Sequence, residues 1–225
     1  MNKRIISFIY RLLVIVSLST GIVLNIIQTT SVTAILSYYT LQSNIICLVA
    51  FVSFVIISSI NGRYQDSDIY HLIKGGITII IAITGIIYNI ALMPIGFEMD
   101  IIKFNAESVS EFLSNFLVHQ ASPMLVILDY FFFDHKGKYK LYYPIIWLFI
   151  PLNYLVYVYT YSSKGGEFFG IGGSQKFAYF FLDYNQIGYK GVTKAILLMI
   201  LFILLISYLL IFVDKKLAKL QNRKH

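Results

Sequence analysis

Residues 35–60, ILSYYTLQSNIICLVAFVSFVIISSI, contain no Asp, Glu, Lys or Arg. A helix needs about 20 mostly apolar residues to cross the hydrocarbon of a bilayer, so this stretch alone predicts a membrane span. Five further stretches of the chain have the same character. The six predicted spans are Ile5–Ile27, Ile35–Ile60, Gly76–Ile95, Phe112–Phe133, Leu141–Thr160 and Lys194–Val213.

The composition of the whole chain agrees with these spans. Hydrophobic residues make up 58% of the 225 residues, and only 13% are charged. A soluble domain of this length has no core large enough to bury so much apolar surface, so lipid must solvate much of it. No repeat or Pro/Gly-rich linker divides the chain. We therefore expect an all-α fold: one polytopic membrane domain over residues 1–225, built as a six-helix transmembrane bundle.

The net charge of +7 is distributed in a way that predicts topology. The basic residues lie between and beyond the apolar segments and form no aromatic-interleaved groove, which argues against nucleic acid as a partner. Cytoplasmic flanks carry the excess of Lys and Arg, so the two termini are predicted in the cytoplasm and the chain in the cell membrane. The predicted cytoplasmic side has twelve basic residues, and the opposite side has five. The twelve are Lys3, Arg4, Arg63, Lys74, Lys136, Lys138, Lys140, Lys215, Lys216, Lys219, Arg223 and Lys224.

Two connections are then predicted to face outward. One is the acidic connection Gly96–Glu111, and the other is the long segment Tyr161–Thr193, which contains five Gly and the aromatic stretch Phe177–Phe181. The favoured interpretation of the long segment is a flexible loop that leads into an interfacial aromatic belt. The alternative is a re-entrant cap over a cavity, which requires protein or water around its backbone.

Polar side chains at membrane depth are candidates for a functional site. Thr40 lies roughly 8 Å into the second span and His119 roughly 10 Å into the fourth, at 1.5 Å per residue, so a hydroxyl and an imidazole have matching depth. Asn115 precedes His119 by one helical turn and is expected on the same face. These side chains, with other polar groups in spans two to five, predict a polar cluster in the outer half of the bundle: Thr40, Gln42, Ser43, Asn44, Asn89, Asn115, His119 and Asn153.

Two charged residues lie nearer the predicted cytoplasmic surface. Arg11 is expected to extend its guanidinium toward that surface, and Asp129 to do the same or to pair with Arg11, so both are interpreted as structural. Pro123 frees the backbone carbonyl of His119 and either opens a polar pocket or kinks the helix. Cys47 is the single Cys, which excludes a disulfide framework and a Cys-based metal site. His119 is taken to be the only buried His, so no metal or cofactor is predicted.

A hydroxyl beside an imidazole is the minimum for nucleophilic acyl chemistry, with His as general base and amides as oxyanion donors. The same polar groups also hydrogen-bond helices to one another in membranes without any chemistry.

Three motifs in this order resemble the androgen-inducible, FAR-type family of six-span membrane proteins and its bacterial relatives. They are Tyr39-Thr40-Leu41-Gln42-Ser43-Asn44, Asn115-x-x-x-His119 followed by Pro123, and Tyr179-Phe180-Phe181-Leu182-Asp183. The resemblance implies a six-helix fold. It also implies a threonine hydrolase of fatty-acid esters, with the nucleophile at Thr40 and the base at His119.

Three functions follow as hypotheses. The first is an intramembrane hydrolase in which Thr40 attacks a fatty-acyl ester and His119 takes its proton, near the outer leaflet. The second is a lipid-binding or sensing protein that uses the same pocket without chemistry. The third is a small transporter, although the spans show no inverted repeat and no Gly-broken helix pair. In each case membrane lipids are the predicted partners.

Overall fold

The computed structural model describes residues 3–60, 63–92, 106–170 and 173–223. It contains six helices that are long and apolar enough to cross a membrane, as expected of a multi-pass membrane protein. The prediction of an all-α six-helix bundle is therefore confirmed. Most of the connection predicted at Gly96–Glu111 lies outside the described residues.

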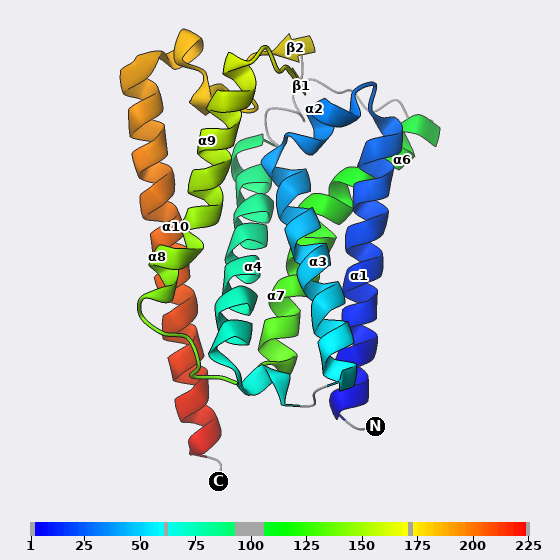
Figure 1. Ribbon diagram of the computed structural model, residues 1–225, viewed down its shortest axis with the longest axis vertical. Helices are drawn as coiled ribbons and strands as arrows, with labels where there is room; N and C mark the ends of the chain where they lie inside the picture. The colour runs from blue at the N-terminus through cyan, green and yellow to red at the C-terminus, as the bar shows by residue number, and fades with distance from the viewer. Residues whose placement is uncertain (1–2, 61–62, 93–105, 171–172, 224–225) are drawn as a thin grey trace.

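The first part of the chain forms four of the spanning helices. They are α1 (Lys3–Gln28), α3 (Tyr39–Ile60), α4 (Asp68–Ile87) and the continuous helix formed by α6 (Ala106–Phe116), η3 (Leu117–Ala121) and α7 (Ser122–Phe133). The short α2 (Val32–Leu36) and the 3-10 turn η1 (Tyr64–Asp66) connect them, and η2 (Tyr88–Leu92) extends α4. These helices pack side by side as a four-helix core (Figure 1).

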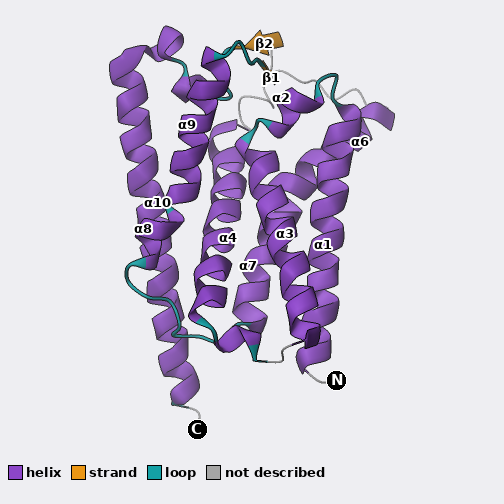
Figure 2. Cartoon of the chain, viewed as in Figure 1, coloured by secondary structure: helices purple, strands orange, loops and turns teal. Residues whose placement is uncertain are grey.

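The remaining helices stand against one side of this core (Figures 1 and 2). They are α8 (Tyr143–Trp147), α9 (Phe149–Ser163) and the long α10 (Tyr184–Asn222). Between α9 and α10 the chain forms a two-stranded antiparallel hairpin, β1 (Phe168–Gly170) with β2 (Gly173–Gln175), and the 3-10 turn η4 (Phe180–Leu182). The start of α1 and the end of α10 lie at the same end of the bundle.

Local sequence explains where several helices begin. The hydroxyls of Ser31 and Ser67 accept hydrogen bonds from the first turns of α2 and α4, and the Asp183 carboxylate does the same for α10. Such caps satisfy backbone N–H groups that have no partner within the helix. Within α10, Gly188 has φ +67°, a left-handed conformation that kinks the first turns away from the rest of the helix.

Charged side chains are buried near the end of the bundle where α1 begins and α7 ends. The Arg11 Nε atom of α1 lies 3.1 Å from Oδ1 of Asp129 on α7, and the Lys74 Nζ atom of α4 lies 2.5 Å from Oδ2 of the same carboxylate. Asp134, just beyond α7, lies 3.3 Å from Nη2 of Arg11. Two cations and two carboxylates therefore join three helices in a buried charge cluster.

This cluster corrects three predictions from the sequence. Arg11 does not reach the surface, because its side chain is 2% exposed and paired with Asp129. Lys74 does not flank a span, since it is fully buried inside α4. His119 is not the only buried His, because His71 in the first turns of α4 is 1% exposed. For Arg11 and Lys74 the partner comes from a distant part of the chain, which hydropathy does not register.

The charge cluster predicts a large effect for Lys74→Met. Loss of the ammonium leaves two buried carboxylates with one cation, which we expect to cost about 3–5 kcal/mol of unfolding free energy. Lys140→Met is the matched control, because Lys140 pairs with Asp68 at an exposed position where solvent and salt screen the ion pair and its loss should change stability little. Thermal unfolding in detergent measures both. Equal melting temperatures for the two variants would contradict a stabilising role for the cluster.

Close packing of α8 on α4 gives a second prediction. The indole of Trp147 donates to the carbonyl of Leu72 at 2.8 Å, and a Cβ added at Gly75 would lie 2.1 Å from the same ring. Gly75→Ala should therefore lower stability by about 1–3 kcal/mol through overpacking. Gly76→Ala, with its nearest approach at 3.1 Å, should cost less. The fluorescence of Trp147, the single Trp, follows unfolding. If Gly75→Ala lost less stability than Gly76→Ala, the close packing of Trp147 on Gly75 would be wrong.

Candidate functional site

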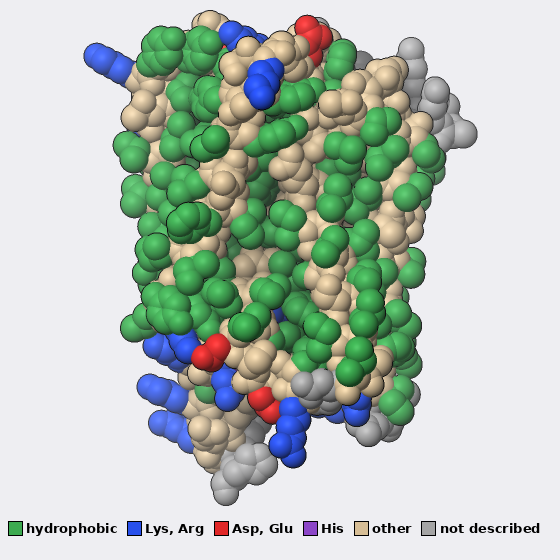
Figure 3. Space-filling view, viewed as in Figure 1, with side chains coloured by type: hydrophobic (Ala, Val, Ile, Leu, Met, Phe, Trp, Pro, Cys, Tyr) green, Lys and Arg blue, Asp and Glu red, His purple; other side chains and the backbone are tan. Residues whose placement is uncertain are grey.

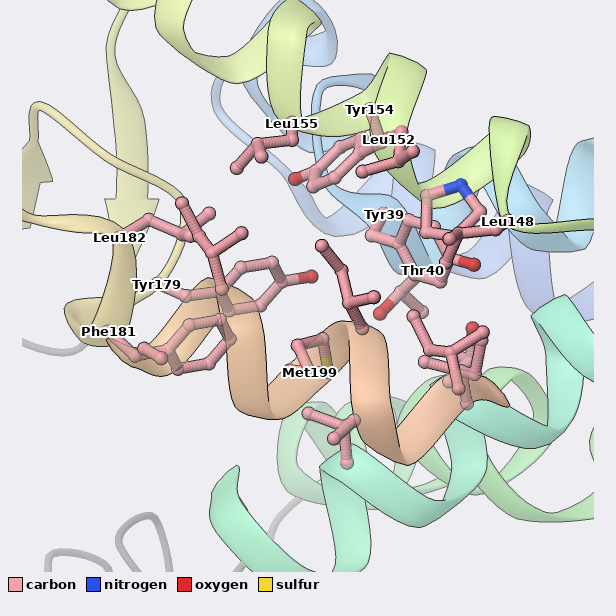
Figure 4. Close-up of a pocket in the computed structure, with 18 of the residues that line it drawn as sticks. Tyr39, Thr40, Leu148, Leu152, Tyr154, Leu155, Tyr179, Phe181, Leu182 and Met199 are labelled. Carbon is pink, nitrogen blue, oxygen red and sulfur yellow. The ribbon is translucent and has the colours of Figure 1, made fainter. Parts of the chain in front are cut away.

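A cavity of about 100 Å³ lies between the core helices α3 and α4 and the helices α9 and α10 (Figure 4). Aliphatic side chains form most of its wall, and no charged side chain lines it. Hydroxyl groups are its polar elements, and they come from three spanning helices and from the segment before α10: Tyr39, Thr40, Thr84, Tyr88, Tyr154 and Tyr179. The cavity therefore suits an apolar ligand that carries uncharged hydrogen-bonding groups.

Thr40, the predicted nucleophile, lies on the wall of this cavity at the start of α3. Its hydroxyl lies near the phenol of Tyr179, which also lies near Tyr154. In Figure 4 the Tyr179 ring points into the cavity, with its hydroxyl toward Thr40. Burial raises the pKa of Tyr179, so the phenol stays neutral and keeps a proton to donate.

His119, the predicted base, lies behind the cavity wall. Its ring stacks on Tyr88 with centroids 3.7 Å apart and planes 10° apart, and Tyr88 itself lines the cavity. The imidazole is 8% exposed and lies near the backbone of Thr84, and no described residue hydrogen-bonds to its Nδ1 atom. Both Thr40 and His119 are described, and no hydrogen bond joins them. We infer that the Tyr88 ring lies between the imidazole and the cavity.

Ser43 and Asn44 connect the helices around Thr40. Asn44 Nδ2 donates to the carbonyl of Thr40 at 2.8 Å and to that of Val118 at 3.1 Å, which ties α3 to η3 beside His119. The Ser43 hydroxyl lies 2.7 Å from the hydroxyl of Thr84, which ties α3 to α4. These two predicted supporting residues are buried, and they hold the three helices that carry Thr40, Thr84 and His119.

Both elements that contribute the stacked rings are π-helical. Tyr88 begins η2 and His119 lies within η3, and each segment has the wider i→i+5 turn. Such turns occur frequently at functional sites. The wider turn also corrects the prediction for Asn115, which is exposed although it precedes the buried His119 by four residues. The extra residue per turn moves His119 off the face that Asn115 occupies.

The other predicted supporting residues lie outside the cavity wall. Asn89 and Asn153 are exposed, and each donates to the carbonyl four residues earlier in its own helix at 2.7 Å. Gln42 is half-buried and donates to the carbonyl of Leu36 at 3.3 Å. Gln42 and Asn153 line a separate groove between α3 and α9. Of the predicted cluster, Thr40 lines the cavity and Gln42, Ser43 and Asn153 line the groove, whereas the other four residues line neither.

The segment before α10 covers the cavity. Tyr179, Phe181 and Leu182 line it, and two phenols fasten the segment to the spans. Tyr38 donates to the carbonyl of Phe169 at 2.9 Å, and Tyr159 donates to that of Leu182 at 2.9 Å. The described part of this segment is thus a packed cap, the less favoured of the two sequence interpretations. Tyr179 was not among the site residues predicted from the sequence, although it lies in the aromatic stretch Phe177–Phe181.

No family model, curated protein or solved structure matches this chain. The resemblance to the FAR-type family therefore stays a prediction from the motifs. Among the described residues, no group of three or more His, Cys, Asp or Glu side chains is placed to hold a metal ion.

The bridging role of Asn44 predicts the effect of Asn44→Ala. This change removes the donor shared by two carbonyls on different helices, and we expect a loss of about 1–3 kcal/mol. Asn25→Ala is the control, because Asn25 donates only to Gly21 in its own helix. Thermal unfolding in detergent compares them. If both variants melt at the same temperature, the interhelical bridge does not stabilise the site.

Proposed function

We propose that this chain is a membrane hydrolase that cleaves a lipid-like fatty-acyl ester with Thr40 as nucleophile and His119 as general base. The observation that supports it best is the Thr40 hydroxyl on the wall of an apolar cavity, with a buried imidazole behind that wall whose Nδ1 has no partner. The resemblance of the motifs to FAR-type proteins supports the same assignment of the two residues.

The reaction is an acyl transfer in two steps. Thr40 Oγ1 forms a bond to the ester carbonyl carbon while its proton passes to His119, and His119 then gives that proton to the departing alcohol. Water attacks the acyl-threonine, loses its proton to His119, and releases the fatty acid as Thr40 recovers its hydrogen. The neutral phenol of Tyr179, which points toward Thr40, is the candidate donor to the oxyanion.

Proton transfer requires a rearrangement of side chains. A general base must come within about 2.6–3.2 Å of the proton donor, and catalytic hydrogen bonds often tighten only in the complex with substrate. Here Tyr88 stacks on the imidazole and also lines the cavity. The proposal therefore includes a change of the Tyr88 rotamer when an ester enters, which brings the imidazole into contact with Thr40.

The second candidate is a lipid-binding protein without chemistry. The specific observation in its favour is that Tyr179 points toward the Thr40 hydroxyl, whereas no hydrogen bond joins the described Thr40 and His119. In that case the hydroxyl groups of the cavity serve only as hydrogen-bond partners for a bound lipid.

The proposed location is the cell membrane, with both termini in the cytoplasm. Support comes from the Lys and Arg side chains that gather at the end of the bundle where α10 ends (Figure 3). The start of α1 lies at the same end. The cavity and its cap lie toward the opposite end, which the proposal assigns to the outer leaflet.

Hydrolysis in lipid nanodiscs tests the proposed function. The wild-type protein should cleave a fluorogenic long-chain acyl ester, and Thr40→Ala and His119→Ala should each lower the rate at least about 100-fold, the scale of general-base catalysis. Thr160→Ala and His135→Ala are matched controls, because both residues are exposed and neither lines the cavity. They should leave the rate unchanged.

Two further variants separate the candidates. Thr40→Ser keeps a hydroxyl nucleophile, whereas His119→Gln keeps hydrogen bonding but loses the base. A hydrolase retains activity only in the first, while a lipid-binding protein retains ligand in both. Two results together would favour the second candidate over the hydrolase. The wild type would show no ester cleavage above empty nanodiscs, and a lipid would co-purify with the wild type and with both variants.

A further inference from the structure

A second concavity opens on the surface of the bundle between α3 and α9. Its volume is about 330 Å³, and its polar lining comes from Tyr39, Gln42, Ser43 and Asn153. Tyr39 and Tyr154 line both this groove and the cavity described above. Their rings pack edge to face with centroids 5.1 Å apart, so this pair forms the wall between the two spaces.

The groove is mostly apolar, but it carries two amide side chains at positions where a spanning helix normally presents apolar ones. Asn153 is exposed on α9, and its own-helix hydrogen bond to Phe149 leaves the amide oxygen available. Gln42 is half-buried on α3 and uses one N–H for the carbonyl of Leu36. Amides that face hydrocarbon are costly and in membranes usually mark a ligand or a partner. The groove thus offers both donors and acceptors to a molecule in the lipid.

Tyr39 supplies an independent observation. Its side chain is 8% exposed, and its hydroxyl is buried without any hydrogen-bond partner. A buried hydroxyl left unpaired lowers stability by about 1–3 kcal/mol, which a hydrogen bond from a ligand would offset. Tyr39 lines both the groove and the cavity, but its hydroxyl is covered, so a ligand supplies that bond only after a small movement of the Tyr39 side chain.

The lining also restricts the charge of the ligand. Among the residues that the structure describes, no Lys, Arg, His, Asp or Glu lines the groove or the cavity. A phosphate or a free carboxylate would enter without a cation to pair with, which is strongly unfavourable at membrane depth. An uncharged group with hydroxyl and ester oxygens meets the amides and phenols without that cost.

We propose that the groove binds the glycerol part of an uncharged acylglycerol, with its ester oxygens toward Tyr39. The free hydroxyl of the glycerol pairs with the amides of Gln42 and Asn153, and one acyl chain passes the Tyr39–Tyr154 wall into the apolar cavity. As a statement about substrate class this rests on the proposed function, whereas the binding itself requires no turnover.

Photolabelling in nanodiscs of a zwitterionic lipid tests the proposal. The probes are a photoreactive diacylglycerol, the matching phosphatidic acid and the matching free fatty acid. We expect saturable labelling by the diacylglycerol alone. Labelling by phosphatidic acid or fatty acid at equal or higher affinity would overturn the assignment of an uncharged ligand.

Two variants test the named residues. Tyr39→Phe should weaken diacylglycerol binding roughly threefold to tenfold, the value of one hydrogen bond, with a melting temperature no lower than wild type because no protein partner is lost. Asn153→Leu should weaken binding similarly. Asn25→Leu is the matched control, since Asn25 makes the same own-helix hydrogen bond on α1. If Tyr39→Phe binds diacylglycerol as tightly as wild type and melts at a higher temperature, Tyr39 has only a packing role and the proposed ligand contact is wrong.

Thr40→Ala separates this inference from the proposed function. It should abolish hydrolysis and keep diacylglycerol binding within about twofold of wild type, because Thr40 does not line the groove that holds the glycerol and Ala preserves an apolar wall for the acyl chain in the cavity. Diacylglycerol that binds wild type without being cleaved would end the hydrolase proposal for this substrate and leave the groove intact. Cleavage of other esters without diacylglycerol binding would end the groove proposal alone.

Discussion

The pairing of Lys74 and Arg11 with Asp129 is the contact on which the arrangement of the helices depends. Lipid chains are as apolar as Leu, so spans do not associate through the hydrophobic effect, and packing and polar contacts must select their neighbours. One fully buried carboxylate on α7 receives a guanidinium from α1 and an ammonium from α4. A mispaired helix would leave at least one of these charges buried alone, and that cost selects a single arrangement.

The charge cluster fixes the helices at one end of the bundle, and the polar groups at the opposite end, around the cavity, are uncharged side chains. There the buried groups are hydroxyls, amides and one imidazole, and several of their atoms lack partners: Tyr39 Oη, Asn44 Oδ1 and His119 Nδ1. Unpaired buried polar atoms lower stability, and proteins tolerate them where a ligand completes the hydrogen bonding. We infer that the stability contributed by the charge cluster offsets the cost of the unpaired polar atoms around the cavity.

The candidate site was only partly readable from the sequence. Thr40, Ser43, Asn44 and His119 were selected as polar residues at membrane depth, and all four are buried in the structure. Asn115 was misplaced because a helical-wheel argument assumes an α-helix, and η3 is a π-helix. Tyr179 was missed as a site residue because its aromatic run is equally typical of an interfacial belt, and only the fold of the cap directs that phenol at Thr40.

By itself, the sequence determined the number of spans and the all-α class, because the length and apolarity of a segment decide whether it can cross lipid. It also fixed several helix starts through local caps such as Ser67 and Asp183. Only the tertiary structure decided which face of each helix turns inward, because hydropathy reports depth along a helix and not rotation about its axis. That rotation buries Lys74 against a carboxylate 55 positions later in the chain. It also sends Asn153 to the groove and places Tyr88 between His119 and the cavity.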